Sequence, residues 1–427
     1  MLSSAATHPW SLGLHKSPTT DPEKWVFDWA LVLLVVSLPF SKAVGSLAEA
    51  LMGASWLISL RRPGQALNLR RNFLANKMLW GFPAVYLGLL WGSFYSENVG
   101  ETWAELNLKH YFLTLPLMIG SWPPSQNRLR WALPGFVLAN LVVAASILGI
   151  VWTGKPWMMG TPEIPSPWIQ RPRASIFLAL SLLGLIHWAF ETYRGMSYRG
   201  NRPGLRSWGL WSLAFCLLLT GLLLLKGRIG QVGLVGGIAW MGWRTFKELK
   251  NQVKVLALLT LACLLAWSQL ESVRQPFEEA VQEIKESQTG YPSSEPEFSS
   301  MGMRFTYWST YARLWLEHPW LGVGTGDLVP IGRQLFKNHP LEIPFHRPHN
   351  QWLELAVQLG IPGMVLLAWA WWLFWKNRPN QHRVFTEIFH LLFLGSTFLD
   401  STLSTQTGIS AFIALALVLH YTETDQD

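Results

Sequence analysis

Charged side chains are scarce in this sequence. They make up 14% of its 427 residues, whereas half of the residues are hydrophobic and 26 are tryptophans. A soluble domain typically carries about 25% charged residues, and it would struggle to keep this much apolar surface away from water. The composition therefore excludes an ordinary water-soluble protein and predicts one that crosses a membrane several times.

Cysteine is nearly absent as well. Cys216 and Cys263 are the only two, and they lack the spacing of metal ligands. Both fall within apolar runs, so we expect each to be a small buried hydrophobic residue. The first 24 residues also lack the basic tip, apolar run and small-residue cleavage site of a signal peptide. We therefore expect that the first membrane span is not removed by a signal peptidase.

About twelve apolar runs are long enough to cross roughly 30 Å of hydrocarbon. Inside lipid every backbone N–H and C=O must be paired within its own segment, so runs without strand alternation are expected to be helices. The predicted fold class is an all-α polytopic membrane protein with about twelve transmembrane helices. The expected spans are 25–41, 43–60, 78–95, 105–121, 131–152, 174–192, 207–225, 229–243, 254–271, 351–375, 384–400 and 404–421.

The lysines and arginines that give the net charge of +8 are distributed as the expected topology requires. If the N-terminus is cytoplasmic, the inside loops carry most of the lysines and arginines, as the positive-inside rule requires. This distribution indicates an inner-membrane protein with both termini in the cytoplasm, and it gives no sign of a nucleic-acid partner. The basic inside loops are 61–77, 128–130, 194–206, 244–254 and 376–383. The outside loops hold only Lys42, Lys109, Lys155, Arg171, Arg173, Lys226 and Arg228.

The expected topology divides the chain into three parts. Residues 1–271 form an N-terminal bundle of about nine transmembrane helices, 272–350 form a periplasmic segment with two or more helices, and 351–427 form about three more spans and a short cytoplasmic tail. Within the periplasmic segment, Pro276 opens a first helical pattern, residues 287–300 form a linker, and a second helix should run from Ser300 to just before Pro319.

Several polar residues that are far apart in sequence fall on the outer side in this topology. Arg228 lies at the outer end of a pair of spans, Arg304 lies in the periplasmic segment, and Asp400 ends a span that finishes outside. An arginine beside hydrocarbon is costly unless it meets an anion, and its planar guanidinium fits phosphate oxygens. The alternatives are an interfacial cation for Arg228 and an exposed helix residue for Arg304.

His349 stands beside Asn350 at the start of a long apolar helix. An imidazole at this place is suited to accept a proton from a sugar hydroxyl, although a lone interfacial histidine is more often structural. Asp400 would either orient this histidine, bind an acceptor hydroxyl or cap a helix end. His339 and His346 lie nearby, but no carboxylate or cysteine falls at ligand spacing, so no metal site is expected.

The glycine-rich stretch GVGTGD at 322–327 lacks the spacing of a dinucleotide-binding loop, and no strand precedes it. We expect these glycines to permit a tight turn and a close approach of the backbone near the site. Asp327 at its end, together with Arg347, Asn350 and Asp400, completes the set of supporting candidates around His349.

Three stretches in this order resemble the shared core of the O-antigen ligase and O-antigen polymerase superfamily. They are GRIGQ at 227–231, MRFTYWSTYARLWLEHPWLGVGTGD at 303–327 and RPHNQWLELAVQLGIPG at 347–363. The resemblance covers about the C-terminal half of the chain. One departure is Lys226-Gly227 before the arginine, where family members often carry a serine directly before it.

The resemblance implies a GT-C type membrane glycosyltransferase that needs neither metal nor cofactor. Its donor would be a glycan on undecaprenyl diphosphate, with Arg228 and Arg304 binding the diphosphate and His349 as the catalytic base at the periplasmic face. The compact chain favours an O-antigen ligase, whose acceptor is lipid A-core, over the polymerase that joins repeat units. A transporter is the alternative from another class, but it would place charged or broken helices near the bilayer midplane. Charged residues such as Asp28 and Glu49 are exceptions to the gathering of polar residues at the outer face.

Overall fold

The computed structural model describes residues 21–161, 165–199, 205–245, 300–337, 347–379 and 382–422. These residues fold into α-helices and short 3-10 helices, and no β-strand occurs among them. The all-α fold class is therefore confirmed for the described chain. The elements are α1 (Pro22–Ser37), α2 (Lys42–Ser59), α3 (Gln65–Ala75), η1 (Lys77–Trp80), α4 (Gly81–Gly92), η2 (Ser93–Tyr95), α5 (Val99–Lys109), α6 (Tyr111–Ser121), α7 (Gln126–Leu129), α8 (Ala132–Thr153), α9 (Arg171–Arg199), α10 (Leu205–Leu224), α11 (Arg228–Thr245), α14 (Ser300–Glu317), α15 (Leu328–Lys337), α16 (Gln351–Lys376), α17 (Arg383–Leu399), η4 (Thr402–Ser404) and α18 (Gln406–Tyr421).

Every predicted span except 254–271, which lies outside the described residues, coincides with helix. The span predicted at 105–121 is divided between α5 and α6. By length and composition, three helical stretches of the described chain are long and apolar enough to cross a membrane, and a bent pair of helices from Gln65 to Tyr95 would make a fourth. These helices agree with a membrane protein, while the number of twelve crossings stays a prediction. The three stretches are Gln126–Thr153, Arg171–Thr192 and Gln351–Lys376.

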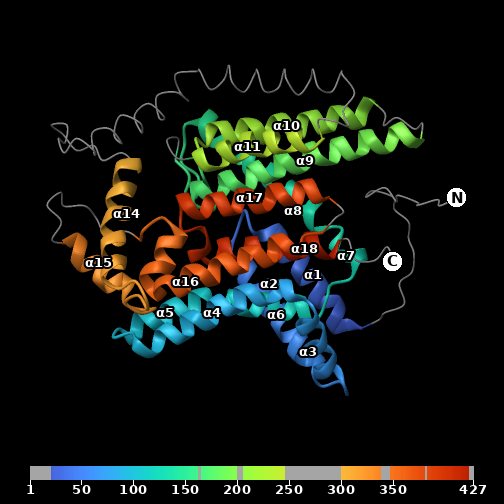
Figure 1. Ribbon diagram of the computed structural model, residues 1–427. Helices are drawn as coiled ribbons and strands as arrows, with labels where there is room; N and C mark the ends of the chain where they lie inside the picture. Colours follow the sequence, from blue (N-terminus) through green and yellow to red (C-terminus); the bar gives the residue numbers. More distant parts are fainter. Residues whose placement is uncertain are drawn as a thin grey trace, which may run out of the picture.

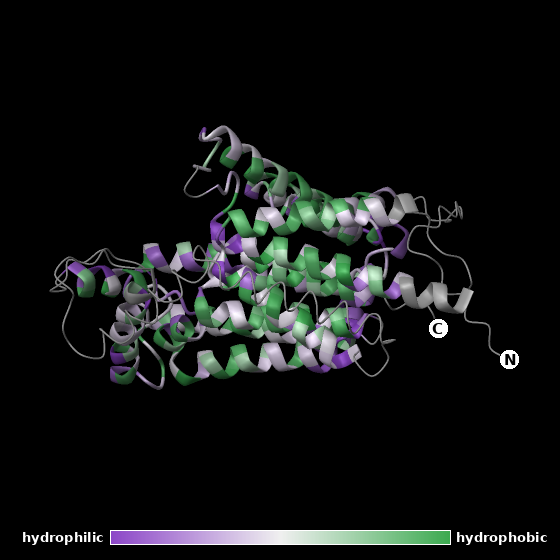
Figure 2. Cartoon of the chain, turned by 90° about the horizontal axis from the view of Figure 1, so that it is seen from above, coloured by the Kyte–Doolittle hydropathy of each residue, from purple (hydrophilic) through white to green (hydrophobic). Residues whose placement is uncertain are grey.

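Most helices run side by side, and α14 and α15 lie together at one end of the bundle (Figure 1). Apolar residues fill the middle of the helices and polar residues gather toward their ends (Figure 2). At the end away from α14, the Lys24 ammonium donates to the Trp122 carbonyl over 3.2 Å, and the Gln126 amide donates to the Tyr421 carbonyl. The start of α1 and the end of α18 therefore lie at the same end, as an even number of crossings requires.

The helix predicted from Ser300 to just before Pro319 is present as α14 (Ser300–Glu317). It packs on α15 and α16 through Tyr307, Tyr311 and Leu314, which are all buried. This buried face carries Arg304 one turn before Tyr307, so the arginine is turned toward the bundle. The helix predicted from Pro276 and the linker before Ser300 lie outside the described residues.

Cys216 corrects one expectation. It lies on α10, but its side chain is exposed on the surface of the described protein instead of being buried among other helices. The apolar run alone does not show which face of a helix meets its neighbours, and Cys216 falls on the outward face. Cys263 lies outside the described residues.

Candidate functional site

His349 and Asp400 form a pair. His349 Nδ1 lies 3.0 Å from Asp400 Oδ1, although 51 residues separate them in the chain. A carboxylate accepts hydrogen bonds and does not donate them, so Nδ1 carries the proton and the basic lone pair is on Nε2. The pair therefore has the arrangement of a general base held in one tautomer by an acidic partner.

Packing between the start of α16 and the end of α17 brings the pair together. The Trp352 indole N–H donates to Thr397 Oγ1 over 3.1 Å, and its ring stacks on Phe398 at a centroid distance of 5.3 Å. Ser404 then donates to Gln351 Oε1 over 3.0 Å and so attaches the segment after Asp400 to the first turn of α16. The two elements are thus joined on both sides of the pair.

The backbone around His349 has an unusual shape. Its φ is +50°, in the left-handed region that non-glycine residues rarely adopt. The next residue, Asn350, caps α16 by accepting the N–H groups of Trp352 and Leu353, each over 3.0 Å. His349 therefore lies two residues before the first residue of α16, in a left-handed turn.

Arg347 is held in a buried charge network. Its guanidinium pairs with Glu354 over 3.1 Å and with Glu105 of α5. Lys109, which is fully buried, lies 3.0 Å from Glu105 and 2.9 Å from Glu354 and also donates to Gln358. Two cations and two carboxylates balance one another, so the network anchors the segment two residues before His349 without leaving an unpaired charge.

Asp400 is ionised in this environment. Burial opposes its ionisation, but the hydrogen bond from His349 and the positive charges of Arg173 and Arg304 favour the charged carboxylate. Asp400 Oδ1 also accepts the N–H of Ser401 over 3.0 Å. The carboxylate is therefore available as a charged partner for His349 at neutral pH.

Arg304 reaches the same place from α14. Tyr307, one turn further along that helix, has its ring centroid 6.1 Å from that of His349. Burial lowers the pKa of Arg304 most, Asp400 raises it, and the charges of Arg228 and Arg171 lower it, with a net decrease. Arg304 therefore shares one electrostatic environment with Asp400, Arg228 and Arg171.

Arg228 is the first residue of α11, and two glycines set its position. A Cβ atom at Gly227 would lie 2.2 Å from Ser175 Cβ, and one at Gly230 would lie 2.1 Å from the Ser175 carbonyl oxygen. Only glycine allows α11 to approach α9 this closely. The backbone N–H of Gly230 also donates to Ser175 Oγ over 3.2 Å. The two glycines of GRIGQ thus allow the first turns of α9 and α11 to pack in direct contact.

Sequence reasoning missed two arginines in the first turn of α9. Arg171 repels Arg228 and Arg304 electrostatically, and Arg173 is attracted by Asp400. From the sequence alone, both are basic residues of an outside loop and nothing more. Their spacing, Arg-Pro-Arg directly before an apolar run, places them at a helix start, and this was the signal that could have identified them.

The structure does not bring Asp327 to His349. Asp327 is buried and accepts the backbone N–H groups of Glu97 and Asn98, each over 2.9 Å. The glycine-rich stretch before it makes the expected tight turn, with φ of +69° at Gly322 and +110° at Gly324. It packs on α16 where that helix is interrupted at Gly360, so Asp327 and the glycines shape the end of the bundle that carries α14 and α15.

Asn350, Arg347 and Asp400, the other supporting candidates, all lie next to His349, as a cap, an anchor and an ionised partner. Within the described ranges, no three His, Cys, Asp or Glu side chains are grouped as metal ligands would be. His339 and His346 lie outside those ranges.

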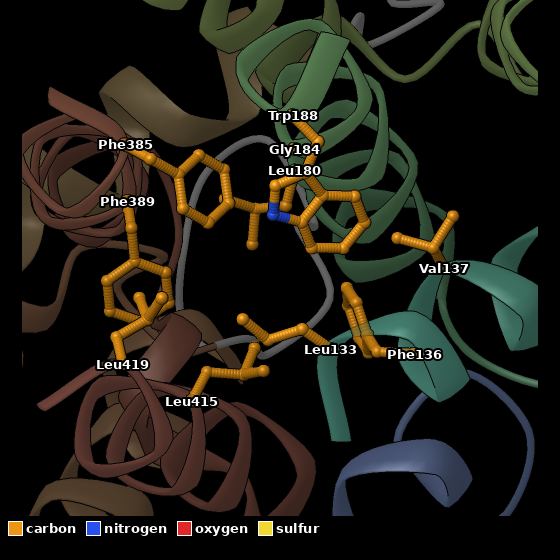
Figure 3. Close-up of a pocket in the computed structure, with 10 residues that line it drawn as sticks. All are labelled: Leu133, Phe136, Val137, Leu180, Gly184, Trp188, Phe385, Phe389, Leu415 and Leu419. Carbon is orange, nitrogen blue, oxygen red and sulfur yellow. The ribbon is translucent and has the colours of Figure 1, made fainter. Parts of the chain in front are cut away.

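An apolar pocket lies elsewhere in the bundle, between α8, α9, α17 and α18. It is lined by side chains such as Phe136, Leu180 and Leu415 (Figure 3). Phe385, in the first turn of α17, and Leu419, near the end of α18, also line it, whereas Asp400 follows the opposite end of α17. The pocket is therefore separate from the polar cluster around His349.

Residues 213–368 match the family model described as O-antigen ligase. The matched range contains Arg228, Arg304 and His349, while Arg171, Arg173 and Asp400 lie beyond its ends. The resemblance seen in the three sequence stretches is thereby confirmed. A comparison with curated proteins found no match.

Proposed function

We propose that this chain, which carries an O-antigen ligase family domain over residues 213–368, is a membrane glycosyltransferase that transfers O-polysaccharide from undecaprenyl diphosphate to a sugar hydroxyl of lipid A-core. The observation that carries the proposal is the pairing of His349 with Asp400 over 3.0 Å beside arginines from separate helices. The arrangement supplies a proton acceptor and an anion site in one place.

In the proposed reaction, Nε2 of His349 accepts the proton of the acceptor hydroxyl. The hydroxyl oxygen then forms a bond to the anomeric carbon of the donor sugar, while the bond from that carbon to the diphosphate oxygen breaks on the opposite face. The electron pair of the broken bond stays with the diphosphate. The transfer therefore inverts the anomeric configuration and yields the glycosylated acceptor, undecaprenyl diphosphate and a protonated imidazole.

Asp400 and the arginines act on the two charges that this step creates. Ionised Asp400 stabilises the imidazolium of His349, because opposite charges attract strongly in a partly buried site. Arg228 and Arg304 stabilise the negative charge that develops on the leaving diphosphate. Preorganised positive groups of this kind take the role that a divalent cation has in other transferases, and each typically contributes about 10²–10³ in rate.

We place the reaction on the periplasmic face of the bacterial inner membrane. The basic loops at 61–77 and 128–130 lie at the end of the bundle away from His349, as the positive-inside rule requires for a cytoplasmic end. The glycan donor and lipid A-core would then approach the end that carries α14 and α15.

The test of the chemistry is transfer by the purified full chain, with a defined undecaprenyl diphosphate-linked donor and lipid A-core as acceptor. His349→Ala should lower the rate by at least about 10²-fold, the lower range for loss of a general base, and EDTA should leave the wild-type rate unchanged. His318→Ala, at an exposed histidine of the same outer segment, is the control. Wild-type activity of the His349 variant would remove this residue as the base.

A deletion strain separates the ligase from the polymerase. Loss of a ligase leaves lipopolysaccharide without O-antigen, whereas loss of a polymerase leaves a single repeat unit on lipid A-core. Restoration by the wild-type chain but not by His349→Ala would connect the phenotype with the site. The single-repeat phenotype would assign the chain to the polymerase reaction, with the same catalytic residues.

A further inference from the structure

The first turns of α9 and α11 meet at the polar cluster. Gly227 and Gly230 hold the start of α11 against Ser175 in the first turn of α9. The N-terminal end of each helix presents unpaired backbone N–H groups and a partial positive charge. Two such ends with Arg171, Arg173 and Arg228 concentrate positive charge in one small region, which is a favourable environment for an anion.

Arg173 is a second observation that points to a ligand in this region. Only 6% of its surface is exposed, and its Nε is buried without a hydrogen-bond partner among the described residues. The carboxylate that attracts it is Asp400, which already accepts a hydrogen bond from His349. Burying a guanidinium with an unsatisfied N–H is costly, so an anion that bonds to it would repay a large desolvation penalty.

The charges in the region are not balanced. Among the residues that the structure describes, Asp400 is the carboxylate that acts on Arg173 and Arg304, while Arg171, Arg228 and Arg304 repel one another, so four positive charges stand against one negative charge. By contrast, the Arg347 network beneath the site is neutral. The excess positive charge is therefore close to the His349–Asp400 pair and is available to an anion.

We propose that Arg171 and Arg173 bind the diphosphate of the glycan donor together with Arg228 and Arg304. The four arginines bind the released diphosphate more strongly than the diphosphate ester of the donor. This inference rests on the proposed function. Cleavage at the anomeric carbon leaves the electron pair on the diphosphate, which gains one negative charge. Interactions that strengthen as that charge develops lower the barrier, whereas interactions of equal strength with donor and product do not.

The experiment measures binding without turnover. Undecaprenyl diphosphate and undecaprenyl phosphate are titrated into the purified full chain in lipid nanodiscs, and their dissociation constants are compared. The wild type should bind the diphosphate more tightly than the monophosphate. Arg171→Gln and Arg173→Gln should each weaken diphosphate binding by roughly 10- to 100-fold, the range for one charge-assisted hydrogen bond, and should reduce the preference over the monophosphate.

Lys155→Gln is the matched control, because Lys155 is an exposed cation in the loop before α9. Arg173→Lys keeps the positive charge but loses the planar guanidinium, so it should bind the diphosphate with an affinity between those of the wild type and Arg173→Gln. If Arg173→Gln does not fold, this lysine variant tests whether the guanidinium of Arg173 binds the diphosphate. Wild-type binding by the Arg171 and Arg173 variants, with loss in Arg228→Gln and Arg304→Gln, would overturn this inference alone. Failure of the wild type to bind undecaprenyl diphosphate would instead count against the proposed function.

Discussion

His349 is held in a strained position by several independent contacts. A left-handed backbone at a non-glycine residue costs on the order of 1–3 kcal/mol and persists only where the surroundings enforce it. Asn350 caps the following helix, Arg347 is anchored by two carboxylates, and Asp400 binds the ring. These contacts fix both the backbone and the imidazole, which is what a group that must accept a proton from one direction requires.

The role of Asp400 can be tested with a substitution that keeps its shape. Asp400→Asn removes the charge that stabilises the imidazolium, and we expect a rate of transfer lower by about 10²-fold, within the range for a general base that has lost its partner. Undecaprenyl diphosphate binding should change much less. Steady-state kinetics on the purified variant, with Glu101→Gln as a control carboxylate of α5, would measure the difference. An equal loss in both variants would argue against a specific partnership.

At the scale of elements, close packing of α9 and α11 positions the arginines. Gly230→Ala would place a methyl group 2.1 Å from the Ser175 carbonyl oxygen, so the helices must separate. We expect a loss of about 1–3 kcal/mol in stability, as for overpacking of a core, together with weaker binding of undecaprenyl diphosphate as Arg228 moves. Thermal unfolding and ligand titration on the same preparation would measure both effects.

Gly236→Ala is the matched control in the same helix. A Cβ atom at Gly236 would meet nothing within 4 Å, and alanine is favoured over glycine in a helix interior by about 0.5–1 kcal/mol. This variant should be as stable as the wild type or more stable, with unchanged binding. If both alanine variants behaved alike, the contact with Ser175 would not be what holds the two helix starts together.

Local sequence patterns predicted some helices well but not the contacts between them. Spacing of apolar residues predicted α14 and α16 nearly to the residue, because a helical stripe and a following proline are local features. The same procedure placed Glu105 in a span and Lys109 among the outer-loop cations. Their partners, Glu354 and Arg347, lie far along the chain, and no local pattern indicates that four charges will neutralise one another in a buried network.

For the whole molecule, the two ends of the bundle should face opposite sides of the membrane. Lys155→Cys, before α9, should react with a membrane-impermeant maleimide added to the periplasm, whereas Arg61→Cys, after α2, should react only after the membrane is opened. Both residues are exposed. The background would be Cys216→Ser with Cys263→Ser. Labelling of position 61 from the periplasm would reverse the orientation and place His349 in the cytoplasm, away from a periplasmic donor.

The sequence by itself determined the class of the molecule, since sparse charge, long apolar runs and basic loops are sums over many residues and need no knowledge of contacts. It also indicated His349, Arg228 and Arg304 as candidate site residues, through their place in the expected topology and through short stretches that resemble a known family. Only the tertiary structure decided that Asp400 is the partner of His349, that Asp327 binds backbone near α5, and that Arg171 and Arg173 join the other arginines. The physical reason is that a site is made by distances between groups, and packing sets those distances between segments that the order of residues leaves far apart.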